Sequence, residues 1–358
     1  MVNLVKHFSA SIPEATEKFC AAAERCRAYT VLFANPLPGP SGETLHAAAA
    51  RIGGRSAKRV LLVISGEHGV EGHGGAGIQT ALLDQGFKPP GDCAVLMIHH
   101  INPWGAAWNV RENEDNIDLF RNFTYSLKTS QVDPLYAEID EAVNLRALEG
   151  PQRTKADRSL EALIQRYGQD RLLWALRRGQ YDFPKGMTYH GRGPTWSKLV
   201  LDSMIRTSIP DCEELVVLDI HSGVPGNGET MVVSYETPES KNGQRLKRLF
   251  GDVYFAGQDP SIPDHSDPYP WTFVDAVLPG VKLFFVPIEL CSEREPLTFD
   301  QVREHHYFHT YGDLTSDRAR EDGRRFRSSY YVEEDAWKQK VAEAGIGLFH
   351  TLLKDLTS

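Results

Sequence analysis

The sequence has few cysteines, and none of them are paired in the spacing of a metal or redox motif. There are five, an odd number, and no CxxC pair occurs among them. Such a set does not suit a disulfide scaffold or a structural zinc–thiolate site. We therefore expect reduced thiols at Cys20, Cys26, Cys93, Cys212 and Cys291.

The chain also lacks long apolar runs and positive net charge. No stretch approaches the ~18 continuous apolar residues of a membrane helix. The first residues, Met1–Ala10, have no apolar core followed by a small-residue cleavage site, so we expect no signal peptide. The formal net charge of -9 would repel nucleic acid and anionic membranes. We expect a soluble cytoplasmic protein that binds neither, with the basic run Arg318–Arg327 forming a solvated helix face.

What the sequence does contain is a set of short apolar runs separated by helix-length segments. At 358 residues, 41% of them hydrophobic, the chain can form one large domain with a sizeable core. The alternation predicts an α/β fold, with a mixed, largely parallel central sheet and helices on both faces. Predicted helices include Gly75–Gln85 and Pro238–Phe250. The predicted strands are Arg59–Ser65, Cys93–His99, Glu214–Ile220, Thr230–Tyr235 and Lys282–Ile288.

Residues 133–197 interrupt this alternation and are predicted to be an insertion. Pro134–Leu148 and Ser159–Arg178 have helical spacing of apolar residues, whereas Gly179–Ser197 is rich in Gly, Pro and aromatics and predicts an ordered loop. An insertion of this length can be a lid over an active site or a peripheral ornament. The last segment, Thr298–Ser358, is predicted to be mostly helical and to pack back on the sheet.

Two predicted strands end in residues that can bind a metal. The first is followed by the turn Ser65–Gly72, in which His68 and Glu71 are three residues apart. The second ends at His221. Neutral imidazole and carboxylate are both good zinc ligands, and ligand sites form beyond the carboxyl ends of strands. HxxE alone, or a lone histidine, is more often structural, but together they supply the three ligands of a catalytic zinc site.

Further polar residues are placed to assist such a metal. Glu289 follows another apolar run and could be an N-cap, an ion-pair partner or a proton-transfer group. Arg111 and Arg121 offer fixed positive charge for a carboxylate or an oxyanion. Asp118 could accept the second N–H of a ligand histidine. A magnesium site fits poorly, because two histidines suit zinc better.

In this order, the motifs resemble the zinc carboxypeptidase superfamily, which includes carboxypeptidase A-like enzymes and the aspartoacylase and succinylglutamate desuccinylase branch. The shared pattern is HxxE, NPxG, RxN, DLNRNF, a DxH strand end and a catalytic Glu, spread here over Ser65–Glu289. The resemblance is greatest to a bacterial branch of uncharacterised carboxypeptidase-like metallopeptidases. Its further marks are Phe8-Ser9-Ala10, the SGxHGVEG turn, NEDN, Gly179-Gln180-Tyr181 and Gly193–Ser197.

The resemblance implies a role for each matching residue. His68, Glu71 and His221 match the zinc ligands, and Glu289 matches the general base and acid. It also implies a single zinc-carboxypeptidase-like domain over residues 1–358, with the insertion at 133–197. Arg111 matches the residue that polarises the scissile carbonyl, Arg121 the one that binds the substrate carboxylate, and Asp118 the partner of the first zinc histidine.

The chain departs from the superfamily pattern at three places. Phe120 replaces the asparagine beside the carboxylate-binding arginine, which removes polar groups from that pocket and adds an apolar wall. The loop after Glu289 reads Leu290-Cys291-Ser292 where the branch usually has FGT. The substrate-covering tyrosine has no secure match. Tyr269 is its candidate substitute, beside Trp271-Thr272-Phe273.

The expected activity is zinc-dependent hydrolysis of an amide bond, either peptide or N-acyl. Zn²⁺ would activate water, with Glu289 as general base and then acid. The expected substrate is a small molecule or peptide that carries a carboxylate. The alternatives left open are an N-acyl-amino-acid deacylase, an esterase of the same fold, and a binding protein that has lost catalysis.

Overall fold

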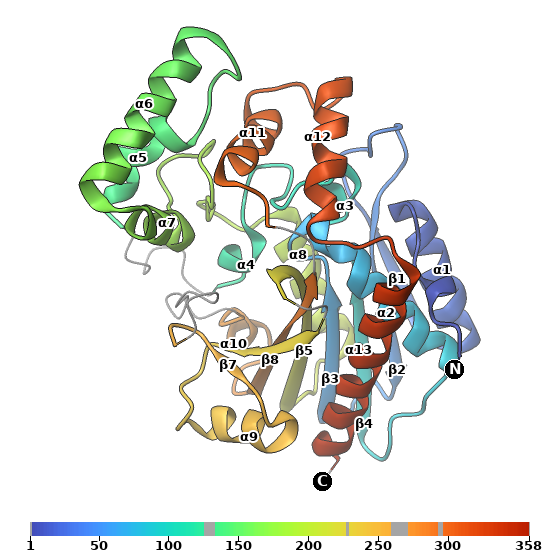
Figure 1. Ribbon diagram of the computed structural model, residues 1–358. Helices are drawn as coiled ribbons and strands as arrows, with labels where there is room; N and C mark the ends of the chain where they lie inside the picture. The colour runs from blue at the N-terminus through green and yellow to red at the C-terminus, as the bar shows by residue number, and fades with distance from the viewer. Residues whose placement is uncertain (1, 125–132, 227–228, 259–270, 293–295, 358) are drawn as a thin grey trace.

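An eight-stranded sheet forms the centre of the computed structural model, which describes residues 2–124, 133–226, 229–258, 271–292 and 296–357 (Figure 1). Its strand order is β1-β2-β4-β3-β5-β8-β6-β7. The central strands β4, β3, β5 and β8 pair in parallel, and antiparallel pairing joins β1, β2 and β4 on one side and β8 and β6 on the other. The strands are β1 (Tyr29–Ala34), β2 (His46–Gly53), β3 (Arg59–Ser65), β4 (Cys93–His99), β5 (Glu214–Pro225), β6 (Thr230–Ser234), β7 (Tyr254–Phe255) and β8 (Lys282–Ser292).

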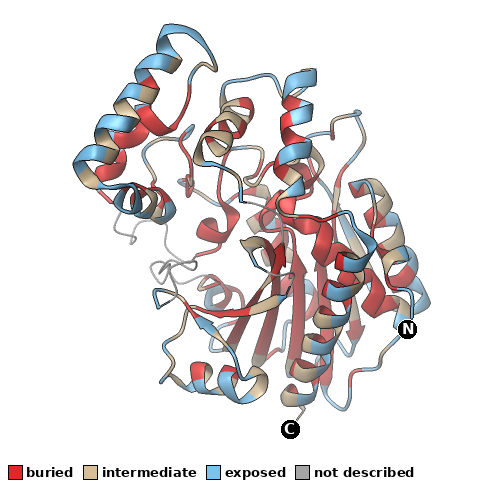
Figure 2. Cartoon of the chain, in the orientation of Figure 1, coloured by how far each residue is buried: buried red, intermediate tan, exposed pale blue. Residues whose placement is uncertain are grey.

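Helices cover both faces of this sheet (Figure 2). Alternate residues of β3 face opposite cores, because successive strand side chains point to opposite sides. Leu61 and Val63 pack with helices α1, α2 and α13, whereas Leu62 packs with α8 and α10. The predicted mixed, largely parallel α/β fold is therefore confirmed. The helices outside the insertion and the C-terminal segment are α1 (Ile12–Arg25), α2 (Gly72–Gln85), α3 (Pro103–Trp108), α4 (Leu119–Asn122), α8 (Trp196–Ser208), α9 (Lys241–Phe250) and α10 (Val274–Val277), with short 3-10 turns η1 (Val5–His7) and η2 (Gly69–Glu71).

Residues 133–197 form three helices with a small core of their own. They are α5 (Leu135–Val143), α6 (Gly150–Tyr167) and α7 (Gln169–Arg178). The segment Ser159–Arg178 is helical as its spacing predicts, but it is divided between α6 and α7 at Gly168, whose φ of 82° is left-handed. The following loop is ordered, since Asn122 donates its side-chain amide to the carbonyls of His190 and Gly193. A lid function for this segment stays a prediction.

The C-terminal segment is helical as predicted, and it joins the insertion to the sheet. It contains α11 (Phe299–Thr310), α12 (Asp317–Ser328) and α13 (Asp335–Leu356). Buried Arg303 of α11 pairs with Asp157 of α6 at 2.8 Å and donates to the carbonyl of Ala142 at 2.7 Å. Arg153 of α6 in turn holds Asp300 of α11 through two hydrogen bonds of 2.7 and 2.6 Å. The insertion is thus fastened to α11 by buried and half-buried charge pairs.

Two further expectations concern the chain as a whole. All five cysteines are free thiols, as predicted. Within the described ranges, none of the helices combines the length and apolarity needed to cross a bilayer.

Stability in acid is expected to depend on His100, which is buried directly after β4. Neither of its ring nitrogens has a hydrogen-bond partner among the described residues, and burial lowers its pKa to about 4. The unfolded chain therefore takes up this proton first as the pH falls below about 6.5, so stability is present at neutral pH and is lost towards pH 4. Between pH 7 and pH 5, we expect the free energy of unfolding of the His100→Asn variant to fall by roughly 2 kcal/mol less than that of wild type.

Urea unfolding of both proteins at the two pH values measures this difference. Asparagine suits the position because the backbone has a φ of 48° there. An identical loss of stability in wild type and variant would contradict the assignment.

Candidate metal centre

The turn after β3 is held rigidly against the segment that carries the NPxG motif. The amides of Gly69 and Val70 donate to the carbonyls of Arg111 and Val110, both at 2.9 Å. A Cβ on Gly69 would lie 2.2 Å from the carbonyl carbon of Gly105, so only glycine allows this approach. The two segments therefore fix where the side chains of η2 point.

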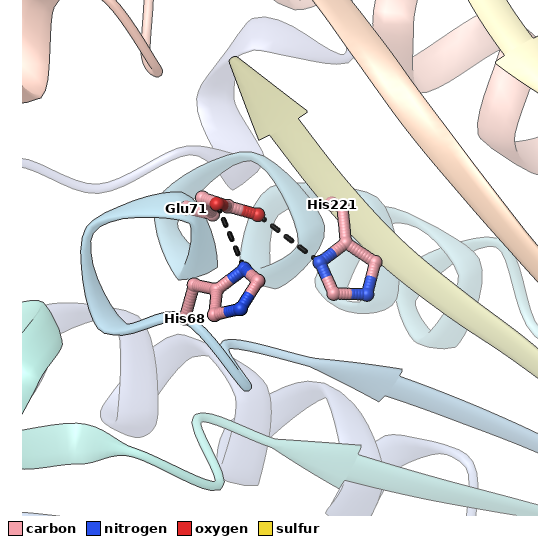
Figure 3. A group of neighbouring side chains, drawn as sticks. All are labelled: His68, Glu71 and His221. Carbon is pink, nitrogen blue, oxygen red and sulfur yellow. Dashed lines mark hydrogen bonds and ion pairs between the residues drawn. The ribbon is translucent and has the colours of Figure 1, made fainter. Parts of the chain in front are cut away.

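His68 and Glu71, in the turn after β3, converge with His221, which lies in the last part of β5 (Figure 3). Glu71 lies between the two rings: its Oε1 is 2.9 Å from Nδ1 of His68, and its Oε2 is 3.1 Å from Nδ1 of His221. The ligand atoms of all three lie within 4.8 Å of one another, and all three residues are buried. Two imidazole nitrogens and a carboxylate in this arrangement can hold one divalent cation.

Glu289 reaches the same place from the neighbouring strand. In the parallel pair β5–β8, His221 and Glu289 are register partners. The Oε2 atom of Glu289 is buried and has no hydrogen-bond partner among the described residues. Burial and the nearby charge of Glu71 raise the pKa of Glu289 to about 7. The carboxyl group can therefore exchange a proton near neutral pH.

Each histidine faces a carboxylate on its far side. Nε2 of His68 lies 3.2 Å from Asp118, and Nε2 of His221 lies 2.9 Å from Asp219. Asp118 also accepts a 2.7 Å hydrogen bond from Arg111, whose Nη2 lies 2.6 Å from the ring of His68. Although burial opposes it, the charges of Arg111 and His68 hold the pKa of Asp118 well below its usual range. Asp118 therefore orients the ring of His68 with Nδ1 towards Glu71 by a hydrogen bond, whereas Asp219 contacts Nε2 of His221 at ion-pair distance without hydrogen-bond geometry.

A second buried carboxylate lies behind His221. Glu67, Asp219 and His221 have ligand atoms within 4.8 Å of one another, and Trp271 donates to Glu67 at 2.9 Å. Burial, together with the charge of Asp219, raises the pKa of Glu67 well above its usual range. This raised pKa favours the neutral form of the Glu67 carboxyl group beside Asp219, although the two groups form no hydrogen bond with each other.

A pocket of about 210 Å³ opens over the three convergent residues and is lined by both predicted arginines. Arg121 is 6% exposed, and within the described ranges it forms no ion pair; its guanidinium lies over the ring of Phe120, 5.1 Å from the centroid. Phe120 meets His221 edge-on at 5.5 Å. The pocket thus combines a buried cation with an apolar floor. The rest of that floor is Val233, Tyr235 and Pro287.

The structure brings together eight of the nine predicted residues and adds others. Tyr269 lies outside the described residues. The adjacent Trp271 and Phe273 are both buried. The tyrosines that line the pocket are Tyr235 and Tyr330, neither of which belongs to a predicted motif. Asp219 could have been found from the sequence, because residues two apart on a strand share a face.

Comparison with known proteins gives one family match and several distant structural likenesses. The model of a family described as "Protein of unknown function (DUF2817)" matches residues 8–344. No curated protein matches the sequence. Carboxypeptidase A from Helicoverpa armigera is 12% identical, with 90% of this chain and 74% of that chain covered and a TM-score of 0.44.

Two other solved structures are similar at the same low level. An aspartoacylase family protein from Mesorhizobium loti is 12% identical, covering 79% of this chain and 67% of that one, with a TM-score of 0.35. A murein-tripeptide amidase from Escherichia coli O157 is 14% identical, covering 80% and 92%, with a TM-score of 0.32. Likenesses at this level do not assign an activity to the chain.

Proposed function

Since the chain belongs to this family of proteins of unknown function (DUF2817), we propose its activity from the site: a zinc-dependent hydrolase that cleaves a peptide or N-acyl amide bond. One observation carries the proposal. His68, Glu71 and His221 converge within 4.8 Å, and Glu289, whose Oε2 atom is buried without a hydrogen-bond partner among the described residues, lines the same pocket. A structural role would leave Glu289 paired, whereas proton transfer needs it free.

The donor set fits zinc. Two imidazole nitrogens and one carboxylate are the protein ligands of many catalytic zinc sites, in which a fourth position stays open. Each histidine has a carboxylate on its other nitrogen, as ligand histidines usually do. A bound Zn²⁺ would supply the Lewis acid that lowers the pKa of water and polarises the scissile carbonyl.

The remaining steps belong to side chains of the chain. Glu289 takes one proton from the attacking water as the C–O bond forms, and it delivers that proton to the leaving nitrogen as the C–N bond breaks. Arg111 lines the pocket and is anchored by Asp118, so its guanidinium can stabilise the oxygen of the carbonyl under attack. We assign these roles to explain why both groups face the pocket.

The leaving group is proposed to carry a carboxylate beside an apolar group. Arg121 is a buried cation in the pocket, and a substrate anion would compensate its charge. Phe120 replaces a polar residue there, so the same pocket also accepts apolar surface. A carboxypeptidase and an N-acyl-amino-acid deacylase both release such a product, and an ester would be cleaved by the same groups.

The test is a product assay on the zinc-loaded protein. Peptides, N-acyl amino acids and their ester analogues are incubated with wild type, and mass spectrometry quantifies the amines released from the amides and the alcohols released from the esters. We expect release of a carboxylate-bearing amine that stops on chelation and resumes with added zinc. If zinc binds stoichiometrically and no member of the panel is cleaved, the chain is a binding protein and the proposal fails.

Asp219 is expected to act on the metal through His221. The Asp219→Asn variant keeps the shape of the side chain but weakens its hold on Nε2 of His221. We expect zinc affinity to fall by roughly 10–100-fold, measured by competition with a chromophoric chelator. The exposed Asp115, changed in the same way, is the control. Equal affinities for all three proteins would exclude this role.

A further inference from the structure

A second cavity continues from the metal pocket towards the insertion. Its volume is about 560 Å³, within the range of small-ligand pockets. Arg111, Arg121, Gly223 and Tyr330 line both spaces. Arg111 lies at this junction. A substrate whose scissile carbonyl faces Arg111 and whose leaving group occupies the metal pocket would extend its acyl side into the second cavity.

The wall of this cavity comes from the insertion and the C-terminal helices. Figure 1 shows α11 and α12 above the strand ends that carry the metal pocket, with α7 to one side. Part of the wall is apolar, and Phe299 and Val302 of α11 pack against the core of the insertion. The charge pairs between α6 and α11 keep these walls together. The apolar lining residues include Leu173, Leu176, Met187, Phe299, Val302 and Phe326.

The other part of the wall offers buried hydrogen-bond acceptors. The side chain of His309 is 4% exposed and its Nδ1 has no hydrogen-bond partner among the described residues. Its other nitrogen bonds to the backbone of Asn113, and burial lowers its pKa to about 4, so Nδ1 is an acceptor at neutral pH. A carboxylate oxygen of Glu112 lies 4.0 Å from this nitrogen. Glu112 faces Arg111 at 3.9 Å, so Nδ1 of His309 is the acceptor that a donor from the ligand would satisfy.

The hydrogen-bond acceptors in this wall distinguish two kinds of acyl group that the cavity could hold, a plain alkyl chain and a peptide. A plain alkyl chain would fill the apolar part but would leave Nδ1 of His309 buried against hydrocarbon without a partner, which is unfavourable. A peptide offers both an apolar side chain and N–H groups. We propose that the cavity binds the acyl side of a short peptide, with an apolar side chain against Val302 and an N–H donated to His309. This inference rests on the proposed function.

Three probes that share one leaving amino acid test this: Leu-Ala-Phe, N-octanoyl-Phe and N-acetyl-Phe. Their dissociation constants are measured by calorimetry on zinc-loaded Glu289→Gln protein, and their kcat/KM values on wild type. We expect the peptide to bind at least 10-fold more tightly than either acyl derivative, because only the peptide fills the cavity and also supplies the N–H.

Variants of the cavity separate its two parts. Val302→Trp fills the cavity and should weaken peptide binding at least 10-fold, with N-acetyl-Phe unchanged within twofold. His309→Phe should remove the preference for the peptide over N-octanoyl-Phe, and His309→Gln, which retains an acceptor, should restore part of it. Leu163→Trp, in the same apolar cluster but outside the cavity lining, is the control for folding.

The outcomes distinguish this inference from the proposed function. Equal binding of peptide and N-acetyl-Phe, tighter binding of N-octanoyl-Phe, or no binding of any probe would overturn the peptide cavity. Peptide binding that Val302→Trp and His309→Phe weaken supports the cavity even if wild type cleaves none of the probes. Peptide binding without cleavage would contradict the proposed hydrolase activity and leave the peptide cavity standing.

Discussion

Glu289→Gln is expected to reduce turnover by about 10³-fold while one zinc ion stays bound per chain. Glutamine has nearly the same shape but cannot take a proton from water. The carboxyl oxygen that it replaces is buried without a hydrogen-bond partner among the described residues, so little folding stability depends on it. Initial rates and metal content, measured on the same preparation, give both quantities.

A matched change on the surface controls for handling and charge. Glu239→Gln, at an exposed position, should leave rate and metal content as in wild type. If the Glu289→Gln protein kept its zinc and its wild-type rate, proton transfer would have to come from another group.

Removing a metal ligand is expected to have the other large effect. His221→Ala leaves two of the three protein ligands. We expect zinc affinity to fall by more than about 100-fold, which is a larger loss than that expected for Asp219→Asn. Activity at sub-saturating zinc should fall to background. Thermal unfolding gives a readout independent of activity, because a ligand that binds only the folded chain raises its Tm.

The control for this change is His350, an exposed histidine on α13. Zinc should raise the Tm of wild type and of His350→Ala alike, and it should leave the Tm of His221→Ala unchanged. A zinc-dependent rise in the His221→Ala protein equal to that of wild type would mean that the ion binds elsewhere.

The parts of the fold that the sequence predicted well are its fully buried strands. β3 and β4 begin and end at the predicted residues, because strands covered on both faces appear as uninterrupted apolar runs. The edge strand β1 and its neighbour β2 were not predicted. β2 contains four consecutive alanines, which do not favour a strand by propensity, and its pairing with β4 is a tertiary contact.

The residues of the candidate site also differ in how well the neighbouring sequence predicts their position. His68, Glu71, His221 and Glu289 follow strong strand signals, so the sequence predicts their place near the strand ends, and the resemblance to the superfamily predicts their common role. Tyr330 could not be predicted, because it approaches the pocket from the turn after α12 and belongs to no motif. The second cavity was equally inaccessible, since its walls combine α7, α11 and α12, which come together only through packing and charge pairs.

Zinc-edge anomalous diffraction from zinc-soaked crystals can locate the ion directly. We expect one strong anomalous peak per chain, bonded to Nδ1 of His68, a carboxylate oxygen of Glu71 and Nδ1 of His221, with Glu289 close by but not a ligand. A peak at another position, or no peak between these three side chains at saturating zinc, would contradict the proposed zinc site.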